Sequence, residues 1–216
     1  MNAPISSRFA ALQGQRPEAI DTPALVIDAD AVNRNMQRMA EFAAKHQIRL
    51  RPHAKMHKSA ELARLQMQAG AVGVCVQTVG EGEALAAGGV NDIFITNQIV
   101  SPAKLRRVAA LAHLLKNRGG RLAIAVDSLE GVERLNQAMQ LSSAQIDVFI
   151  EIDIGQGRCG VPPGEQAIAL ARLIKEHPRL NYAGLHAYHG LAQHLRSATE
   201  LSRSEERRVG KECRSR

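Results

Sequence analysis

One lysine of this chain stands where a reactive amine would be useful. Residues 50–58, Leu-Arg-Pro-His-Ala-Lys-Met-His-Lys, follow an apolar stretch and precede Ser59, which can cap a helix over residues 60–68. Lys55 is therefore predicted at the carboxyl end of a strand, where α/β proteins place their chemistry. A Schiff base requires a free amine, which cationic or polarisable neighbours favour. The neighbours of Lys55 of this kind are His53, His57 and Lys58. The alternative interpretation is a solvated surface lysine.

A glycine-rich turn is the second candidate for chemistry. Residues 151–161, Glu-Ile-Asp-Ile-Gly-Gln-Gly-Arg-Cys-Gly-Val, run from a strand into a turn that carries Arg158. Glycines let the backbone approach a planar ligand closely. An arginine beside the nitrogen or the phenolic oxygen of a heteroaromatic cofactor tunes its electronics. The alternative is a tight turn with a solvated arginine.

The elements that must position these residues alternate between strands and helices. Each strand-like run precedes a segment with helical periodicity, and the runs cover residues 24–27, 48–52, 73–77, 92–96, 121–126, 148–153 and 182–188. Seven β/α units in one parallel sheet predict a (β/α)8 TIM-type barrel that is incomplete, with its eighth unit beyond the end of the chain. A doubly wound sheet is the alternative.

Helix start signals agree with this alternation. Thr78 and Glu81 form a capping-box pattern, and Ser128 can cap the helix that follows residues 121–126. Asp30 is the predicted cap of the first helix. Because the caps come directly after the strand-like runs, helix starts and strand ends are predicted to share one edge.

Polar residues gather at the predicted carboxyl ends of the strands. Because these ends meet at one edge of a parallel sheet, we expect their side chains to line one pocket. Its predicted members are Asp28, Asp30, His53, Lys55, Gln77, Thr78, Asn97, Asp127, residues 153–158, Tyr188 and His189. Lys55 is the only amine among them.

Composition excludes several classes of protein. The 216 residues are 45% hydrophobic but only 3% aromatic, which favours helices packed on a buried parallel sheet over an aromatic-rich sandwich. No apolar run approaches the roughly 20 residues of a membrane span, and the first residues lack signal-peptide features, so we expect a cytoplasmic protein. The cysteines show no Cys-x-x-Cys spacing, which argues against a disulfide framework and a thiolate zinc site, and they are Cys75, Cys159 and Cys213.

The net charge of +7 is concentrated at the end of the chain. Residues 203–216 hold six basic and three acidic residues, and the remaining +4 is spread over the preceding residues without a basic stripe interleaved with aromatics. We therefore expect no nucleic-acid partner. The terminal segment resembles the translation of a sequencing-adapter oligonucleotide, so we expect a non-native tail there. A natural basic tail is the alternative.

Five motifs in order resemble one known family. They are Asp-Thr-Pro at residues 21–23, the lysine run at 51–58, Gln77-Thr78 with Glu81 and Glu83, the turn at 153–160, and Gly-Leu-His-Ala-Tyr-His-Gly at 184–190 followed by Gln193-His194. Together they resemble the fold-type III pyridoxal-phosphate enzymes. Within these they are similar to the D-threonine aldolase and D-serine dehydratase group, with its alanine racemase-like N-terminal barrel.

The resemblance implies roles for four residues. Lys55 is similar to the lysine that binds pyridoxal 5'-phosphate covalently and later moves a proton. Arg158 resembles the arginine that contacts the cofactor ring, Tyr188 the residue packed on the ring face, and Gln77 a group that lines the pocket. The resemblance also implies a homodimer that takes a small D-amino acid as substrate, with each site completed across the interface.

The activity that the resemblance implies is a retro-aldol cleavage. D-β-hydroxy-α-amino acids such as D-threonine or 3-hydroxy-D-aspartate would give glycine and an aldehyde. A D-serine dehydratase-like ammonia-lyase, which releases a keto acid and ammonia, is the first alternative, because both reactions use the same lysine. A non-catalytic barrel that carries pyridoxal phosphate is the second, and an amino-acid racemase is a minor third.

Metal chemistry is expected outside this chain. In the family that it resembles, a C-terminal β domain holds a divalent ion (magnesium, manganese or zinc), and we expect that domain to be absent here. His186, His189 and His194 lack the helical spacing of a metal-binding histidine pair, so no metal site is predicted within the chain. The predicted domains are an extension at 1–20, a partial barrel at 21–202 and the tail at 203–216. We expect this barrel alone to be unstable or inactive.

Overall fold

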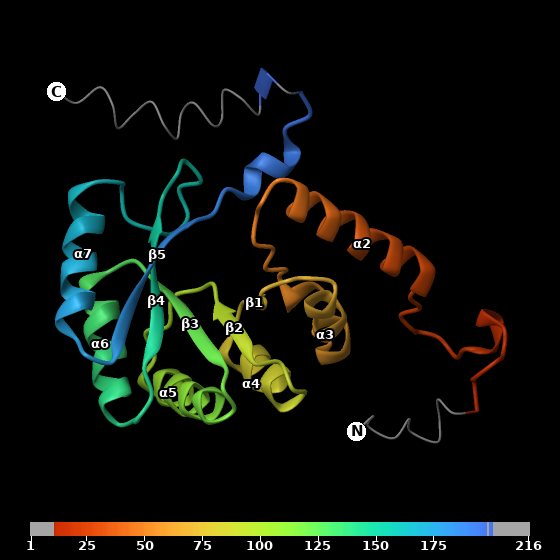
Figure 1. The fold of residues 1–216 in the computed structure, drawn as a ribbon, viewed down its shortest axis with the longest axis horizontal. Helices are drawn as coiled ribbons and strands as arrows, with labels where there is room; N and C mark the ends of the chain where they lie inside the picture. Colours follow the sequence, from red (N-terminus) through yellow and green to blue (C-terminus); the bar gives the residue numbers. More distant parts are fainter. Residues whose placement is uncertain (1–10, 198, 201–216) are drawn as a thin grey trace.

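A parallel five-stranded sheet is the centre of the fold (Figure 1). The computed structural model describes residues 11–197 and 199–200. The strands are β1 (Val74–Val76), β2 (Asp92–Ile95), β3 (Arg121–Val126), β4 (Ile146–Ile152) and β5 (Leu180–Ala187). They lie side by side in sequence order, and every neighbouring pair is parallel. The carboxyl ends of all the strands therefore meet at one edge.

The predicted tail and half of the predicted extension lie outside the described residues. The predicted tail at 203–216, with Cys213, lies there, as do residues 1–10 of the predicted extension. Among the helices that the structure describes, none combines the length and the apolar character needed to cross a membrane.

Helices cover one face of the sheet and confirm the predicted α/β class. In chain order they are α2 (Ala29–Lys45), α3 (Ala60–Gln68), α4 (Val79–Ala87), α5 (Pro102–Asn117), α6 (Leu129–Gln140) and α7 (Glu165–Glu176), with 3-10 turns η1 (Pro17–Ala19), η2 (Ala54–Met56) and η3 (Gly190–His194). Figure 1 shows α4 to α7 in an arc along the outer side of the strands. Between them lies one continuous apolar core, whose largest buried members include Ile93, Leu105, Ile124, Leu135 and Ile150.

The predicted strand at residues 48–52 is wrong, and Pro52 explains why. The segment does run beside β1, because the Pro52 carbonyl accepts a hydrogen bond from the Cys75 amide at 2.8 Å. Proline has no amide hydrogen to donate in return, so the ladder is interrupted. A single parallel bridge between His53 and Cys75 remains of the pairing. The segment still delivers His53 to the carboxyl edge of the sheet.

The predicted strand at residues 24–27 is also wrong. Within the described part of the chain no strand lies beside it, and Leu25, Val26 and Ile27 are 90%, 59% and 49% exposed. An apolar segment becomes a strand only when a neighbour satisfies its backbone groups. The apolar pattern of this segment therefore does not produce a strand here.

Helix α2 stands apart from the sheet (Figure 1) and buries only Ala43. Its N-cap is Asp28, whose carboxylate accepts a hydrogen bond from the Ala31 amide at 2.9 Å. The prediction of Asp30 as the cap was wrong by two residues, because Asp30 already lies inside the first turn. Both carboxylates sit near the positive end of the helix dipole, where they stabilise the helix.

The face of the sheet opposite α4 to α7, called the inner face below, carries a small apolar layer. Phe94, Ala123 and Ala125 are buried there, and Cys75 and Phe149 pack against them. The rings of Phe94 and Phe149 lie 4.7 Å apart between centroids. Burial raises the pKa of the Cys75 thiol to about 11, so this cysteine is a packing residue and not a reactive thiolate.

A row of charges crosses the inner face near the amino ends of the strands. Asp92 pairs with Arg51 at 2.7 Å and with Arg121 at 3.8 Å. Arg121 also pairs with Asp147 at 2.8 Å, and the Asn181 amide donates to Asp147 at 2.7 Å. Each of the two carboxylates therefore has two partners: Asp92 pairs with the edge segment beside β1 and with β3, and Asp147 pairs with β3 and β5. The charges near the amino ends are thus paired with one another, and the candidate site is sought at the carboxyl edge.

The predicted capping box at the start of α4 is confirmed. The Thr78 hydroxyl accepts a hydrogen bond from the Glu81 amide at 3.2 Å, and the Glu81 carboxylate accepts from the Thr78 amide at 3.3 Å. The predicted caps Ser59 and Ser128 also hold the first turns of α3 and α6. Ser101 precedes α5 but makes no side-chain cap hydrogen bond.

Thr78→Ala is expected to lower the free energy of unfolding by about 1 kcal/mol, because the Glu81 amide loses its acceptor. Urea denaturation of the purified chain measures the change. Ser101→Ala is the matched control, since its side chain makes no cap hydrogen bond and its effect should stay within about 0.5 kcal/mol. Equal losses in the two variants would contradict the assigned role of the box.

Candidate functional site

Lys55 lies in η2, directly after the segment that runs beside β1. The turn is closed by hydrogen bonds from the His57 and Lys58 amides to the Ala54 carbonyl, at 3.2 and 2.7 Å. The Lys58 side chain is 68% exposed and pairs with Glu81 at 3.7 Å, whereas Lys55 is half-buried. The two lysines of the run thus differ: Lys58 pairs with the carboxylate of Glu81, and Lys55 stands at the carboxyl edge of the sheet.

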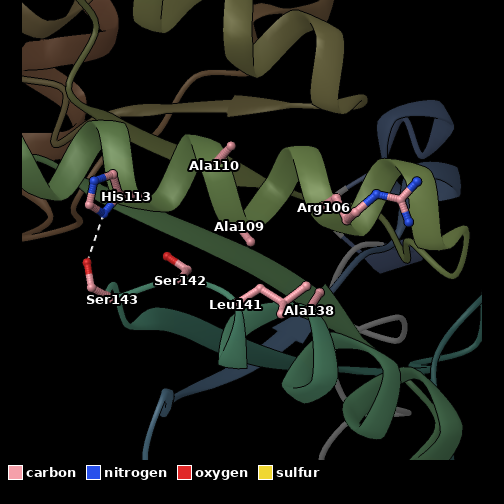
Figure 2. Close-up of a pocket in the computed structure, with 8 residues that line it drawn as sticks. All are labelled: Arg106, Ala109, Ala110, His113, Ala138, Leu141, Ser142 and Ser143. Atoms are coloured by element: carbon pink, nitrogen blue, oxygen red, sulfur yellow. Dashed lines mark hydrogen bonds between the residues drawn. The ribbon is translucent and has the colours of Figure 1, made fainter.

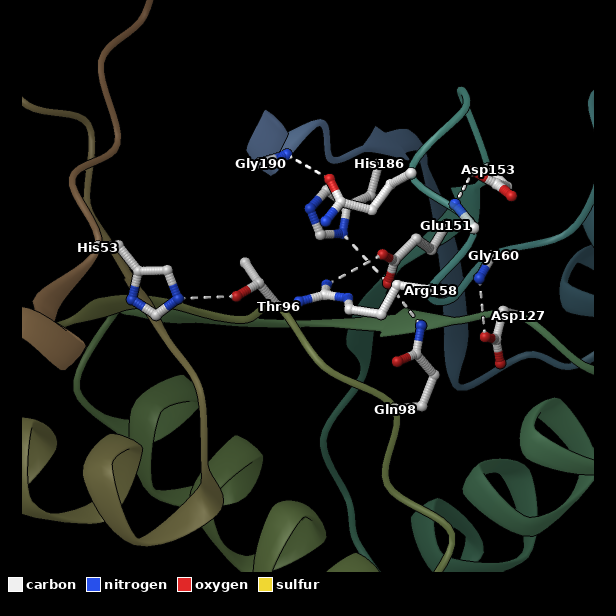
Figure 3. Close-up of polar contacts among 12 residues, drawn as sticks. His53, Thr96, Gln98, Asp127, Glu151, Asp153, Arg158, Gly160, His186 and Gly190 are labelled. Atoms are coloured by element: carbon white, nitrogen blue, oxygen red, sulfur yellow. Dashed lines mark hydrogen bonds and ion pairs between the residues drawn. The ribbon is translucent and has the colours of Figure 1, made fainter. Parts of the chain in front are cut away.

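His53 links the lysine turn to the end of β2 (Figure 3). Its Nδ1 accepts a hydrogen bond from the Lys55 amide at 3.3 Å, and its Nε2 lies 3.1 Å from the Thr96 hydroxyl. The Thr96 hydroxyl donates to the Val76 carbonyl at 3.2 Å, so it accepts from the Nε2 hydrogen. Burial, followed by the charge of Lys55, lowers the pKa of His53. His53 is therefore a neutral imidazole with its proton on Nε2.

Gln77 follows β1 and is half-buried. Its backbone amide donates to the Glu81 carboxylate at 2.8 Å, and the same carboxylate caps α4. One acidic side chain thus fixes the backbone of Gln77 and the start of the following helix. Gln77 is held at the same edge as His53, and its role as a pocket-lining group stays a prediction.

The glycine-rich turn at residues 153–160 is organised around Asp153. The Asp153 carboxylate accepts hydrogen bonds from the Gly155 and Gly157 amides at 2.9 and 3.1 Å. The Gly157 and Gly155 hydrogen bonds hold the pKa of Asp153 below its ordinary value. Asp153 is therefore an ionised residue that shapes the turn.

Gly160 closes the turn against the end of β4. Its φ is +99°, and a Cβ at this position would lie 2.7 Å from the Asp153 backbone nitrogen. Its amide donates to the Asp127 carboxylate at 3.1 Å, which ties the turn to the end of β3. A larger residue at position 160 would displace the turn that carries Arg158.

The structure brings Arg158 and Tyr188 together. The guanidinium carbon lies 4.5 Å from the centroid of the Tyr188 ring, which is a cation–π contact. Gln156 ties the two loops together, because its side-chain oxygen accepts a hydrogen bond from the Gly190 amide at 2.5 Å. An added Cβ at Gly190 would meet the Tyr188 hydroxyl, so a larger residue there would push the Tyr188 ring aside. Two groups from separate segments of the sequence thus share one wall.

Glu151 and Gln98 are the site residues that the sequence analysis missed. Glu151, the sixth residue of β4, is 2% exposed, and its carboxylate accepts a hydrogen bond from the Gln98 amide at 2.5 Å. It also lies 3.6 Å from the Arg158 guanidinium (Figure 3). The signal was present in the sequence, because Glu151 lies between Ile150 and Ile152 in a mostly apolar strand, and a buried acidic residue needs a partner.

A register shift between β4 and β5 places His186 beside Glu151. Val148 pairs with Tyr182, but the next residue, Phe149, pairs with Gly184, so Ala183 is an extra residue in β5. A bulge of this kind changes which side chains face inward. Beyond it, Glu151 pairs with His186, whose Nδ1 lies 3.8 Å from the carboxylate.

The His186 side chain is 16% exposed, and its partial burial affects its pKa. Burial lowers its pKa, while the charge of Glu151 opposes and the charge of Arg158 adds to the shift. Its Nδ1 has no hydrogen-bond partner among the described residues. The charge of His186 also contributes to the lowered pKa of His53. The two imidazoles therefore lie within electrostatic reach of each other.

The predicted pocket includes two residues that do not join it. Asp28 and Asp30 lie at the start of α2, away from the sheet (Figure 1), because the strand expected before them does not form. The other members follow described strands or the edge segment. The polar contacts in Figure 3 run from His53 through Thr96 on one side and link Glu151, Arg158 and His186 on the other.

The groups at this edge fit a planar anionic aromatic aldehyde such as the pyridoxal phosphate implied by the resemblance. Lys55 offers an amine for the aldehyde, Arg158 a cation, and Tyr188 a ring face. The unpartnered Nδ1 of His186 is a buried polar atom that a bound ligand could satisfy. Within the described residues, no group of three histidine, cysteine or acidic side chains could hold a metal ion.

Two hollows on the surface lie elsewhere. One of about 470 Å³ is lined by residues of α5 and α6, with His113 bonded to Ser143 at 2.9 Å across it (Figure 2). The second, of about 570 Å³, shares Arg106, Ala138 and Leu141 with the first. Both lie between outer helices and contain none of the predicted site residues. The candidate site is therefore the carboxyl edge of the sheet.

His53→Gln is expected to flatten the dependence of stability on pH. Because the pKa of His53 is lowered in the folded state, the unfolded chain binds more protons below the ordinary histidine pKa, and the free energy of unfolding falls as pH decreases. Urea denaturation between about pH 5 and about pH 7 measures this slope. An unchanged slope in the variant would show that His53 is not held neutral by the fold.

Comparisons with known proteins agree with the geometry. The family described as "Alanine racemase, N-terminal domain" matches residues 27–213. The D-threonine aldolase of Arthrobacter sp is 42% identical over 181 residues, which are 84% of this chain and 46% of that protein. The 3-hydroxy-D-aspartate aldolase of Paracoccus denitrificans (strain Pd 1222) is 39% identical over 188 residues, 87% of this chain and 48% of that protein.

A solved structure gives the same result. The D-threonine aldolase from Filomicrobium marinum superposes with a TM-score of 0.82 at 41% identity, over 88% of this chain and 50% of that one. The similarity confirms the predicted barrel class. The chain spans about half the length of these relatives. With a match that covers most of its residues, the chain belongs to the alanine racemase N-terminal domain family.

Proposed function

We propose that this chain carries the cofactor-binding barrel of a lyase that cleaves D-β-hydroxy-α-amino acids into glycine and an aldehyde. The relatives named above are a D-threonine aldolase and a 3-hydroxy-D-aspartate aldolase at about 40% identity. The observation that supports the proposal is the set of groups at the carboxyl edge of the sheet: the Lys55 turn with neutral His53 after the edge segment, and the Arg158–Tyr188 pair after β4 and β5.

The family implies pyridoxal phosphate as the cofactor, and the described residues offer it three kinds of contact. Lys55 would bind the aldehyde carbon through its amine. Arg158 would face the ring edge as a cation, and Tyr188 would pack on the ring face. The glycine turn next to Arg158 leaves room for close backbone approach, since added Cβ atoms at Gly155 and Gly157 would meet open space.

The residues would divide the work of the reaction. When bound, pyridoxal phosphate supplies an electron sink for the electron pair released as the Cα–Cβ bond breaks. Lys55 would return as a base or acid that moves a proton at the substrate. His53 stays neutral, so it adds no second positive charge beside Lys55. Arg158 keeps a fixed positive charge at the cofactor edge.

Metal and partner are further parts of the proposal. A divalent ion, magnesium, manganese or zinc, would activate the β-hydroxyl of the substrate. Its ligands would come from outside the described residues, which hold no suitable group of three. A homodimer would complete each site across its interface. We also propose that the 216-residue chain by itself has little activity, because it exposes apolar residues such as Leu25 and Leu185.

Borohydride reduction after incubation with pyridoxal phosphate should attach the cofactor to the peptide that contains Lys55. Lys55→Ala should reduce the attachment to background, because it removes the amine of η2. Lys58→Ala is the matched control, since that side chain is 68% exposed and paired with Glu81, and it should label as the original chain does. Mass spectrometry of the digested protein reads the result, and labelling at Lys58 instead would refute the assignment.

Product analysis tests the reaction itself. The full product of the source gene, given D-threonine or 3-hydroxy-D-aspartate, should release glycine and an aldehyde in equal amounts and leave the L-isomers untouched. Release of a keto acid and ammonia would assign the ammonia-lyase instead. Cofactor binding without either product would favour a carrier barrel. The 216-residue chain measured in parallel shows how much activity resides in this part.

A further inference from the structure

One carboxylate, that of Glu151, is buried near the carboxyl edge of the sheet. The strand alone does not explain why a charged side chain is buried there. Glu151 is 2% exposed and lies on the inner face, whereas its chain neighbours Ile150 and Ile152 face the core under the helices. A charged side chain placed in such surroundings costs several kcal/mol unless a counter-charge and hydrogen bonds compensate it. The compensation has to come from the groups that contact the carboxylate.

Three side chains surround the Glu151 carboxylate. Gln98 donates to Oε2 at 2.5 Å, the Arg158 guanidinium lies 3.6 Å from Oε1, and His186 Nδ1 lies 3.8 Å from Oε2. His186 is held neutral by burial, so it brings no full charge. Among the described residues, Arg158 is therefore the counter-ion of Glu151.

The same pairing decides where the Arg158 side chain points. Arg158 projects from a turn whose glycines at 155, 157 and 160 have φ values of +110°, +67° and +99°, and its side chain is 42% exposed. A long cation on such a turn would otherwise extend into solvent. Glu151 on one side and the Tyr188 ring on the other fix the guanidinium at the site.

We propose that Glu151 is a positioning residue, which orients the charged Arg158 toward the cofactor, and that Gln98 orients Glu151 in turn. The inference rests on the proposed function, because the orientation matters only if Arg158 contacts pyridoxal phosphate. Glu151 sits behind Arg158 and acts through it. Removal of either member of the pair should therefore have the same effect on cofactor binding.

A double-mutant cycle on the full chain tests this. Glu151→Gln keeps the size of the side chain and removes its charge, and we expect the Kd for pyridoxal phosphate to rise about tenfold, as for Arg158→Gln. The double variant should also bind about tenfold more weakly, and not about a hundredfold, because Glu151 has no role once Arg158 is gone. Additive losses, or unchanged binding in Glu151→Gln, overturn the inference.

Two further measurements make the result independent of folding. Glu133→Gln is the control, since Glu133 lies on α6, where its carboxylate is 3.3 Å from His177, and the variant should leave the Kd unchanged. If Glu151→Gln does not unfold cooperatively, Gln98→Leu replaces it in the cycle: it loosens the carboxylate and should raise the Kd about threefold, with no effect in the Arg158→Gln background. An equal loss in both backgrounds overturns the inference.

NMR of the cofactor-free chain separates this inference from the proposed function. The Arg158 Nη–H groups, through which the pair with Glu151 is made, should give a protected side-chain signal that Glu151→Gln removes and Glu133→Gln preserves. If the original chain fails to bind pyridoxal phosphate, the proposed function is refuted and the role toward the cofactor falls with it, while the signal still reports whether Glu151 orders Arg158. If the chain binds pyridoxal phosphate and Glu151→Gln leaves the signal unchanged, the inference alone is refuted.

Discussion

Each strand of the sheet pairs in parallel with the strand that follows it in the chain, so all crossovers pass over one face and all strands end at one edge. The crossover helices bury the apolar side chains of that face in a continuous core. The polar residues are left for the inner face and the strand ends. The candidate site exists because this pairing brings Lys55 and Arg158, which are distant in sequence, to the same edge.

The two ends of the inner face differ in how their charges are arranged. Near the amino ends, Asp92 and Asp147 each have two partners on neighbouring strands or the edge segment, so that charge is balanced within the row. At the carboxyl edge, Glu151 faces Arg158, while burial keeps His53 and His186 neutral. The first arrangement joins strands. The second leaves a cation half-exposed beside an aromatic ring, where an anionic ligand can reach it.

Small local features aim the side chains of this edge. The extra residue in β5 turns His186 toward Glu151, which a regular ladder would not do. Gly160 lets the turn fold back onto β4, and Gly190 leaves room for the Tyr188 ring. None of these features is a reactive group. They decide which reactive groups meet, and a single residue inserted or enlarged at any of them would separate Arg158 from its neighbours.

The sequence by itself determined the fold class, the helix caps at Ser59, Thr78 and Ser128, and the lysine turn, because periodicity and capping are local properties of the chain. The family resemblance supplied the candidate roles of Lys55 and Arg158. Only the tertiary structure decided that residues 24–27 and 48–52 are not strands, since a strand needs a partner with free backbone groups. It also decided that Glu151 is buried beside Arg158, because burial and counter-ions depend on residues that the chain brings together from afar.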